Sequence, residues 1–294
     1  MNDLGVVLTA MVTPFKEDGR VNYEVAANLA QELVANGSDG LVVSGTTGES
    51  PTLTEEEKLK LFSAVVEAVG GKATVIAGTG SYSTKESVKL TTLSEKTGVD
   101  GVMCVSPYYN KPTQEGLYRH FKAIAESTTL PVIIYNVPGR TGVNVEPDTV
   151  IRLARDVSNV VAVKEASGNL DQVAKIRREA PSSFLIYSGE DHLTLPILAV
   201  GGHGVISVAS HLVGSEIKEM CTAYARGDVK RAQDIHLRLW PLFKALFVRT
   251  NPIPVKMALK MLGFEVGGFR LPLCEVSEAE IAPVKAELKS LGLL

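Results

Sequence analysis

Val160-Val161-Ala162-Val163-Lys164-Glu165 combines a short run of β-branched and small apolar residues with a charged end. Seven similar runs, rich in Val and Ile, occur elsewhere in the chain. They are apolar at nearly every position rather than at alternate positions, which is typical of strands buried on both faces of a parallel sheet. The eight expected strands cover residues 6–12, 41–43, 74–77, 101–105, 132–135, 160–163, 184–187 and 205–208.

The spacing of these runs matches that of strand–helix units, with marker residues from Val6 to Val205 lying 20–35 residues apart. A helical pattern begins after Thr54, which can cap it together with Glu57. Further helical patterns cover residues 23–35, 84–96, 113–127, 148–156 and 170–179. Eight strands alternating with helices predict a closed (β/α)8 (TIM) barrel in the α/β class. The alternative is an open doubly wound sheet, but Thr13-Pro14-Phe15 follows the first strand where that fold would place a Gly-rich fingerprint.

The pattern changes after the eighth run. Residues 227–249, 252–262 and 277–291 are helical in pattern, with no strand between them. We therefore expect two domains: a (β/α)8 barrel over residues 1–226 that carries the active site, and a C-terminal helical domain over residues 227–294. No long linker separates them, so the helical extension is expected to pack on the barrel.

The composition favours a small-molecule partner. The 294 residues include 30 Lys+Arg and 33 Asp+Glu, a net charge of −3, and 45% are hydrophobic. A slightly acidic balance without a long basic run argues against nucleic acid or an anionic membrane surface as a partner.

The cysteines and the N-terminus point to a cytoplasmic protein. Cys104, Cys221 and Cys274 form no C-x-x-C pair, which argues against a disulfide framework and a zinc site. Met1-Asn2-Asp3 carries an acid where a signal peptide has bases, and no run approaches the roughly 18 apolar residues of a membrane span.

Lys164 is a candidate nucleophile. Strand alternation places it on the same face as Val160 and Ala162, with Glu165 on the opposite face. A lysine buried in the mouth of a barrel can form a Schiff base, because burial disfavours the ammonium and lowers the pKa. Freeing the amine at pH 7 from a pKa near 10.4 costs roughly 4.6 kcal/mol. The commoner arrangement for a lysine at a strand end is an ion pair, here with Glu165 or Glu190.

Two residues at and after the end of the fifth run could assist the chemistry of Lys164. Tyr135 points inward by alternation, and its hydroxyl could relay protons or bond to the backbone. Arg140 lies on a loop between Gly139 and Gly142, and its planar fork suits a carboxylate, although a solvated loop arginine is the commoner case.

Gly45-Thr46-Thr47-Gly48-Glu49-Ser50 follows the second run. Backbone N–H groups and hydroxyls in such a loop can converge on an anion such as the carboxylate of an α-keto acid. A plain Gly-rich turn is the alternative.

Tyr108 and Tyr109 receive no chemical role on sequence grounds alone. The five histidines form no metal-binding pattern, so no metal site is expected.

Taken together, these motifs resemble the pyruvate-dependent class I aldolases and lyases, the dihydrodipicolinate synthase / N-acetylneuraminate lyase family. The resemblance extends from Thr9-Ala10-Met11-Val12-Thr13-Pro14-Phe15 to Asn251-Pro252-Ile253-Pro254-Val255-Lys256. The family's carboxylate-binding loop resembles the stretch around Thr47, its tyrosine motif resembles Tyr135-Asn136-Val137-Pro138, and its Schiff-base strand resembles Val163-Lys164-Glu165.

The resemblance implies a role for each site residue. Lys164 condenses with pyruvate, and Arg140 holds the carboxylate of L-aspartate 4-semialdehyde, as in the synthase branch. The other implied site residues are Tyr135, Thr47 and Tyr109 as a proton relay, Thr46 and Thr47 on the pyruvate carboxylate, and Gly189 and Ile206 lining the site. Tyr109 would reach in from a neighbouring subunit.

The implied enzyme is a lyase of lysine and diaminopimelate biosynthesis that makes 4-hydroxy-tetrahydrodipicolinate, needs no metal or organic cofactor, and forms a homotetramer as a dimer of dimers. The nearest rival is a sister aldolase acting on sialic acid or a 2-keto-3-deoxy sugar acid. A rival from another class is a catalytically silent protein that senses a keto acid.

The resemblance also bears on regulation. Lysine-inhibited bacterial members of the family carry His at the positions of Glu55 and Lys58 and Asn at the position of Tyr82, although this chain retains their Ser50, Glu86 and Tyr108. Lys58 would place a like charge beside a cationic effector. We therefore predict weak or absent feedback inhibition by lysine.

Overall fold

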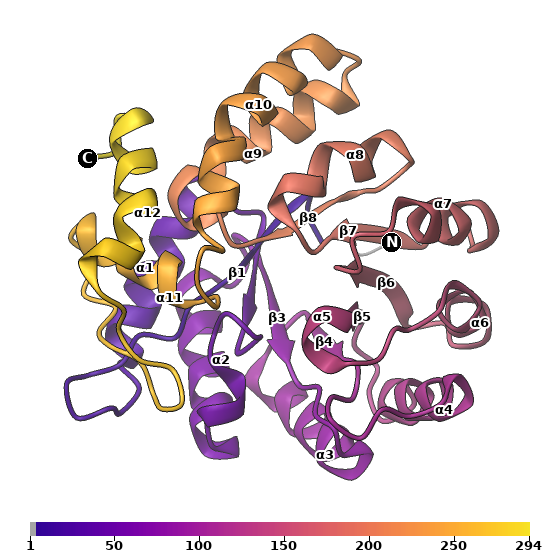
Figure 1. The fold of residues 1–294 in the computed structure, drawn as a ribbon. Coiled ribbons are helices and arrows are strands. Elements are labelled where there is room, and N and C mark those ends of the chain that lie inside the picture. Colours follow the sequence, from indigo (N-terminus) through magenta and orange to yellow (C-terminus); the bar gives the residue numbers. More distant parts are fainter. Residues whose placement is uncertain (1–3) are drawn as a thin grey trace.

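The computed structural model describes residues 4–294; residues 1–3, on which part of the prediction about a signal peptide rests, lie outside it. Its eight strands are all parallel and form one closed barrel in sequential order, with β1 paired to β8 (Figure 1). The predicted barrel is therefore confirmed. The strands are β1 (Val7–Ala10), β2 (Gly40–Val43), β3 (Thr74–Gly78), β4 (Gly101–Val105), β5 (Val132–Asn136), β6 (Val160–Glu165), β7 (Leu185–Ser188) and β8 (Gly204–Ser207).

The strands are largely apolar because both of their faces are buried, and polar residues such as Asn136, Lys164 and Glu165 lie at their C-terminal ends. Outward-facing side chains pack with the surrounding helices in one large core. Inward-facing side chains fill the barrel as a second cluster. Its members include Leu8, Ala10, Val42, Ile76, Met103, Ile133, Tyr135, Ala162, Tyr187 and Ile206.

One detail of β6 differs from the prediction. The pairing of β5 with β6 shifts register, because Val132 is opposite Val160 whereas Ile133 is opposite Ala162. Val160 consequently belongs to the outer core, and Val161 packs against the inner cluster. The predicted shared face of Val160 and Ala162 is wrong, because the irregularity breaks simple alternation there.

Helices surround the barrel (Figure 1). Those that the sequence predicts are α1 (Tyr23–Ala35), α2 (Glu55–Val69), α3 (Thr84–Ser94), α4 (Gln114–Ala125), α6 (Pro147–Asp156) and α7 (Leu170–Glu179). Thr54 and Glu57 form the expected capping box of α2. The structure adds α5 (Pro138–Thr141), α8 (Thr194–Ala199) and α9 (Ser210–Ala225). Two of these, α5 and α8, are too short to leave a periodic apolar pattern, and α9 has no capping side chain at its start and is kinked at Val213.

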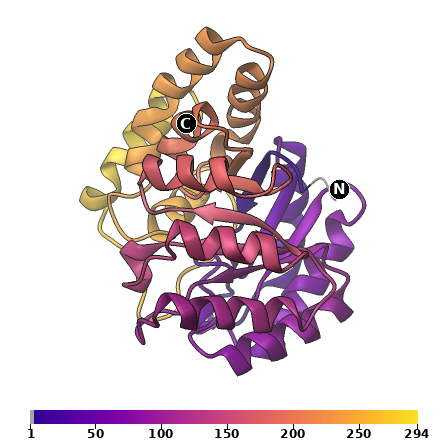
Figure 2. The same cartoon turned by 90° about the vertical axis from the view of Figure 1, so that its right-hand side faces the viewer.

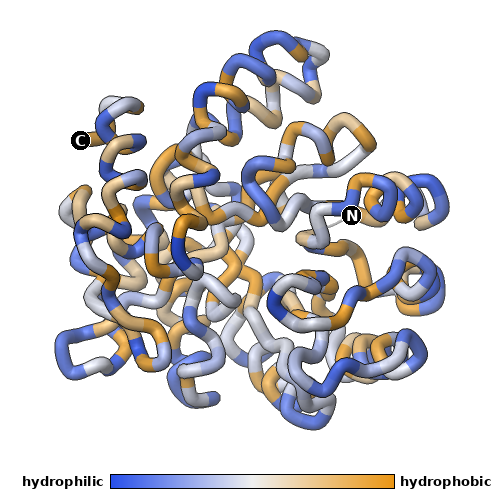
Figure 3. Tube along the Cα trace, viewed as in Figure 1, coloured by the Kyte–Doolittle hydropathy of each residue, from blue (hydrophilic) through white to orange (hydrophobic). Residues whose placement is uncertain are grey.

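Three helices follow: α10 (Val229–Ala245), α11 (Ile253–Met261) and α12 (Glu278–Ser290). They gather on one side of the barrel (Figure 2). Their apolar residues, such as Val255 and Val284, belong to the same continuous core as the outer faces of the strands. Figure 3 shows the matching pattern, in which hydrophilic residues recur along the outer helices while the central strands are largely apolar. Within residues 4–294, no helix has both the length and the apolar character needed to cross a membrane.

Candidate active site

Lys164 lies near the C-terminal end of β6, and its side chain is buried. It is opposite Tyr135 of β5 and Tyr187 of β7 in the barrel register. Its Nζ atom is 4.3 Å from the centre of the Tyr135 ring. Since reactive groups of (β/α)8 barrels sit at this end of the strands, Lys164 occupies the place where such barrels carry their chemistry.

The ion pair considered from the sequence does not form. Within residues 4–294, neither Glu165 nor Glu190 makes a salt bridge to Lys164. Glu165 faces away and accepts hydrogen bonds from Asn136, Ser167 and Gln172 at 2.8–3.2 Å. Strand alternation separates neighbours, so the adjacent carboxylate cannot neutralise the lysine.

The surroundings of Lys164 favour the free amine. Burial lowers the pKa of Lys164 from 10.5 to about 7; the carboxylate of Asp191 opposes this shift and the guanidinium of Arg140 adds to it. Asp191 is held in place by Ser207, whose hydroxyl donates to Oδ1 at 2.5 Å, and by the N–H groups of Val208 and Ala209, which donate to Oδ2 at 3.1 and 3.0 Å. A large fraction of the lysine is therefore unprotonated, and nucleophilic, at neutral pH.

Tyr135 belongs to the inner cluster, as predicted, and is buried. Burial raises the pKa of Tyr135, an effect that the charge of Arg140 and a hydrogen bond with Thr46 oppose. The phenol therefore keeps its proton at neutral pH and stands beside the lysine, where it can donate or accept a proton.

The 45–50 loop has the features of an anion site. The N–H groups of Gly48, Glu49 and Ser50 bond within the loop. Among the hydrogen bonds of residues 4–294, none is donated by the backbone N–H of Thr46 or of Thr47. Two successive free N–H groups form the kind of nest that binds a carboxylate.

Arg140 lies on α5, the short helix after β5, and is exposed. Its Nη2 donates to the carbonyl of Asn251 at 3.2 Å. Thr46, Tyr135 and Arg140 line a single cavity of about 610 Å³. The structure therefore brings these three predicted residues together in one cavity; Lys164 and Thr47 do not line it, but Lys164 contacts Tyr135.

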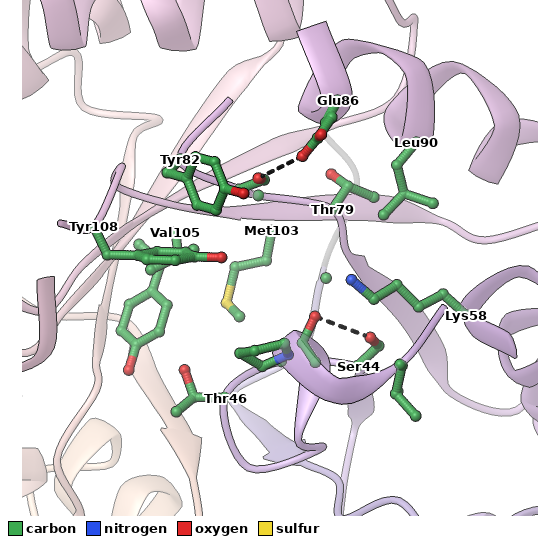
Figure 4. A pocket seen from close by; sticks show the side chains of 18 of the residues that line it. Ser44, Thr46, Lys58, Thr79, Tyr82, Glu86, Leu90, Met103, Val105 and Tyr108 are labelled. Carbon is green, nitrogen blue, oxygen red and sulfur yellow. Dashed lines mark hydrogen bonds between the residues drawn. The ribbon is translucent and has the colours of Figure 1, made fainter. Parts of the chain in front are cut away.

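The same cavity extends towards α2 and α3 (Figure 4). Lys58 reaches into it from α2, and Glu86 of α3 also lines it. Tyr82 and Tyr108 meet edge to face, with ring centroids 5.3 Å apart. Burial lowers the pKa of Lys58, an effect that Glu86 and Glu55 oppose.

The remaining predicted residues lie in different surroundings. Ile206 is buried in the inner cluster. Gly189 follows β7 and donates its N–H to the carbonyl of Glu165 at 2.8 Å; an added Cβ there would come within 2.7 Å of the Cβ of Ala166. Tyr109, with φ of +71°, is 94% exposed and does not line the cavity. Within residues 4–294 the site therefore lacks the third member of the implied relay.

Sequence reasoning missed two residues of this site. Asp191 influences Lys164 from the turn after β7, and the side chain of Asn251 donates to Thr47 Oγ1 at 2.9 Å. Asn251 begins the Asn251-Pro252-Ile253-Pro254-Val255-Lys256 motif, but it lies 204 positions from Thr47 along the chain, so no local pattern links the two.

Comparisons with known proteins agree with this geometry. Residues 3–291 match the dihydrodipicolinate synthetase family. The 4-hydroxy-tetrahydrodipicolinate synthase of Desulforamulus reducens is 59% identical over 292 residues, 99% of both chains. A dihydrodipicolinate synthase from Cyanidioschyzon merolae, solved with lysine bound, superposes with a TM-score of 0.98 at 50% identity over 99% of both chains. The enzyme of Acinetobacter baumannii, solved with pyruvate, gives a TM-score of 0.95 at 37% identity over 99% of this chain and 100% of that one. The chain belongs to the dihydrodipicolinate synthetase family.

Proposed function

We propose that this chain is a lyase that condenses pyruvate with L-aspartate 4-semialdehyde to give 4-hydroxy-tetrahydrodipicolinate, in lysine and diaminopimelate biosynthesis. The observation that carries the proposal is Lys164: a buried lysine without an ion pair in residues 4–294, with its pKa lowered to about 7, beside Tyr135. The names of its relatives and the pyruvate complex of the Acinetobacter baumannii enzyme support the choice of substrates.

The reaction begins at Lys164. Its neutral amine attacks the keto carbon of pyruvate, and loss of water leaves an imine. The nest of Thr46 and Thr47 holds the pyruvate carboxylate. Tyr135, hydrogen-bonded to Thr46, carries the protons that the amine and the departing water exchange.

Carbon–carbon bond formation follows. Protonation of the imine nitrogen makes the former methyl group acidic, and loss of one proton gives an enamine. The enamine carbon attacks the aldehyde, whose oxygen takes up a proton from the relay of Tyr135, Thr47 and Tyr109. The amino group of the second substrate then attacks the imine carbon and expels Lys164, which closes the ring and frees the enzyme.

Arg140 favours aspartate semialdehyde over a sugar acid. Arg140 is exposed and lines the cavity, its charge acts on Lys164, and its fork suits the second substrate's carboxylate. Gly189 and Ile206 complete the lining, the first by leaving room that a side chain would fill.

The site also favours an oligomer. A tyrosine as exposed as Tyr109 can complete a proton relay only where a second copy encloses it. A second exposed apolar surface comprises Leu237 and Trp240 on α10 and the nearby Phe247, which are 67%, 46% and 45% exposed. We propose a cytoplasmic homotetramer, a dimer of dimers, in which residues 1–226 form the catalytic barrel and 227–294 a helical domain. An active monomer in sedimentation would contradict the shared site.

A coupled assay tests the function. Purified protein is given pyruvate and aspartate semialdehyde, and dihydrodipicolinate reductase reports the product through NADPH oxidation. We expect activity in the wild type and none in Lys164→Ala. Borohydride with pyruvate should trap an adduct on the wild type alone; a silent sensor would give none. Cleavage of sialic acid or a 2-keto-3-deoxy sugar acid, with no synthase activity, would establish the sister aldolase.

A further inference from the structure

Two buried polar links join the 45–50 loop to the segment that begins α11. In the first, the side-chain amide of Asn251 donates to Thr47 Oγ1 at 2.9 Å. In the second, the ammonium of Lys256 donates to Glu49 Oε1 at 3.0 Å. Both links connect the same two segments, and none of the four side chains is more than 5% exposed.

The ion pair is fully satisfied. Lys256 Nζ also donates to the carbonyls of Thr13, at 3.1 Å, and Gly268. The other oxygen of Glu49 accepts the N–H of Arg270 at 3.1 Å. A buried ion pair with all its hydrogen bonds made holds its two side chains in one geometry, and removing one partner leaves the other as an unpaired buried charge. The spacing between the 45–50 loop and Asn251 is therefore fixed.

This spacing determines what the Thr47 hydroxyl can do. A hydroxyl has one proton to donate and two lone pairs. The Asn251 amide occupies a lone pair, so the proton points away from it. Within residues 4–294 the Thr47 hydroxyl donates to no acceptor, so its proton is not committed to another protein group.

Asn251 also contacts the second half of the site. Its backbone carbonyl accepts from Arg140 Nη2 at 3.2 Å. One residue thus holds the 45–50 loop with its side chain and Arg140 with its backbone. Tyr135 also relates the two parts, through its hydrogen bond with Thr46 and the nearby charge of Arg140.

We propose that Asn251 is a positioning residue, because its side-chain amide fixes the direction in which the Thr47 hydroxyl donates its proton. The Lys256–Glu49 ion pair keeps Asn251 and the 45–50 loop at the distance that this hydrogen bond needs. The inference rests on the proposed function, because it gives Thr47 a proton to pass. In this proposal Asn251 acts on the reaction only through Thr47.

A double-mutant cycle tests this role. The variants are Asn251→Ala, Thr47→Val and their combination, with kcat and the KM for pyruvate measured in the coupled assay. A misdirected hydroxyl should lower kcat on the order of 100-fold with little change in KM. Because Asn251 acts through Thr47, Asn251→Ala should have no further effect in the Thr47→Val background.

Asn251→Asp is the sharper variant. It keeps the shape of the side chain but can only accept, so it draws the Thr47 proton towards itself; we expect a loss of kcat at least as large as in Asn251→Ala. Asn159→Ala is the matched control, because the Asn159 amide holds three backbone carbonyls at 2.9–3.1 Å beside the start of β6, away from the site. It should leave kcat unchanged.

Borohydride trapping with pyruvate separates the possible failures. An adduct on every variant shows that each folds and forms the imine, so that losses of kcat belong to later proton transfers. With adducts present, additive losses in the cycle, or wild-type activity in Asn251→Asp, would overturn the inference alone. Absence of an adduct on the wild type would overturn the proposed function and this inference with it.

Discussion

The charges around Lys164 allow a test in which two substitutions act in opposite directions. The neutral amine is the nucleophile, so kcat/KM for pyruvate should fall as the pH drops below the pKa of Lys164. Since kcat/KM reports the free enzyme, the acid limb of its pH profile should have a midpoint near 7, the value to which burial lowers this pKa.

The size of the effect follows from the two pKa values. The difference between 10.5 and about 7 corresponds to roughly 5 kcal/mol at about 1.36 kcal/mol per pK unit. At pH 7 about half of the lysine is then neutral, compared with about one molecule in 3,000 for an unperturbed lysine. Burial therefore increases the reactive form by roughly three orders of magnitude.

Asp191→Asn and Arg140→Met are the two perturbations. The Asp191 carboxylate raises the pKa of Lys164, so its loss should move the acid limb to lower pH. Asparagine can keep the local geometry, because its oxygen can accept from Val208 and Ala209 while its amide donates to Ser207. The Arg140 guanidinium lowers the pKa of Lys164, so Arg140→Met should move the limb to higher pH.

The measurement is the initial rate with limiting pyruvate between pH 5.5 and about 9, with the coupling enzyme in excess at each pH. Borohydride trapping over the same range gives an independent profile without the second substrate. A flat profile through neutral pH, a limb above pH 9, or shifts of the same sign in both variants would refute this account of the site.

Three further outcomes are expected. Lys164→Met should raise the free energy of unfolding by up to about 4 kcal/mol at pH 7, because the native pKa lies below the unfolded value of 10.5; the gain is complete below pH 7 and vanishes towards 10.5, as urea unfolding at several pH values would show. Inhibition by free lysine should be weak or absent, because the Lys58 side chain already places a basic group in the cavity; an inhibition constant in the millimolar range or below contradicts this. Gly204→Ala should prevent stable folding, since its Cβ would lie 2.0 Å from the Val6 carbonyl; soluble protein with a wild-type melting temperature would show that the barrel yields there.

The barrel was predictable because its signal is local and repeated. Every strand is buried on both faces, so each leaves a short apolar run, and the intervals are long enough for one helix. Helices with ordinary signals, such as α2 with its Thr54 capping box, were also found. The very short α5 and α8, and α9, which has no capping side chain at its start and is kinked at Val213, were not. The position of Val160 was mispredicted, because the register irregularity beside β5 depends on the neighbouring strand.

The site was predictable to the extent that it lies on strand ends. Lys164, Tyr135 and Ile206 lie in the barrel mouth or interior because alternation and strand order put them there. Whether Lys164 was paired or free could not be predicted, since that depends on Asp191, Arg140 and the depth of burial. The role of Tyr109 remains a prediction, because it requires a second copy of the chain.

Periodicity in the chain thus specified the eight strands, their order and the residue at the end of each. Barrel closure and the packing of α11 specified the rest: the free amine of Lys164, the open N–H groups of the 45–50 loop, and the contact of Asn251 with Thr47. The physical reason is the range of the interactions. A pattern of apolar residues records which face of an element is buried, whereas desolvation and hydrogen bonding at the site depend on groups that lie as much as 207 positions apart and meet only in the folded chain.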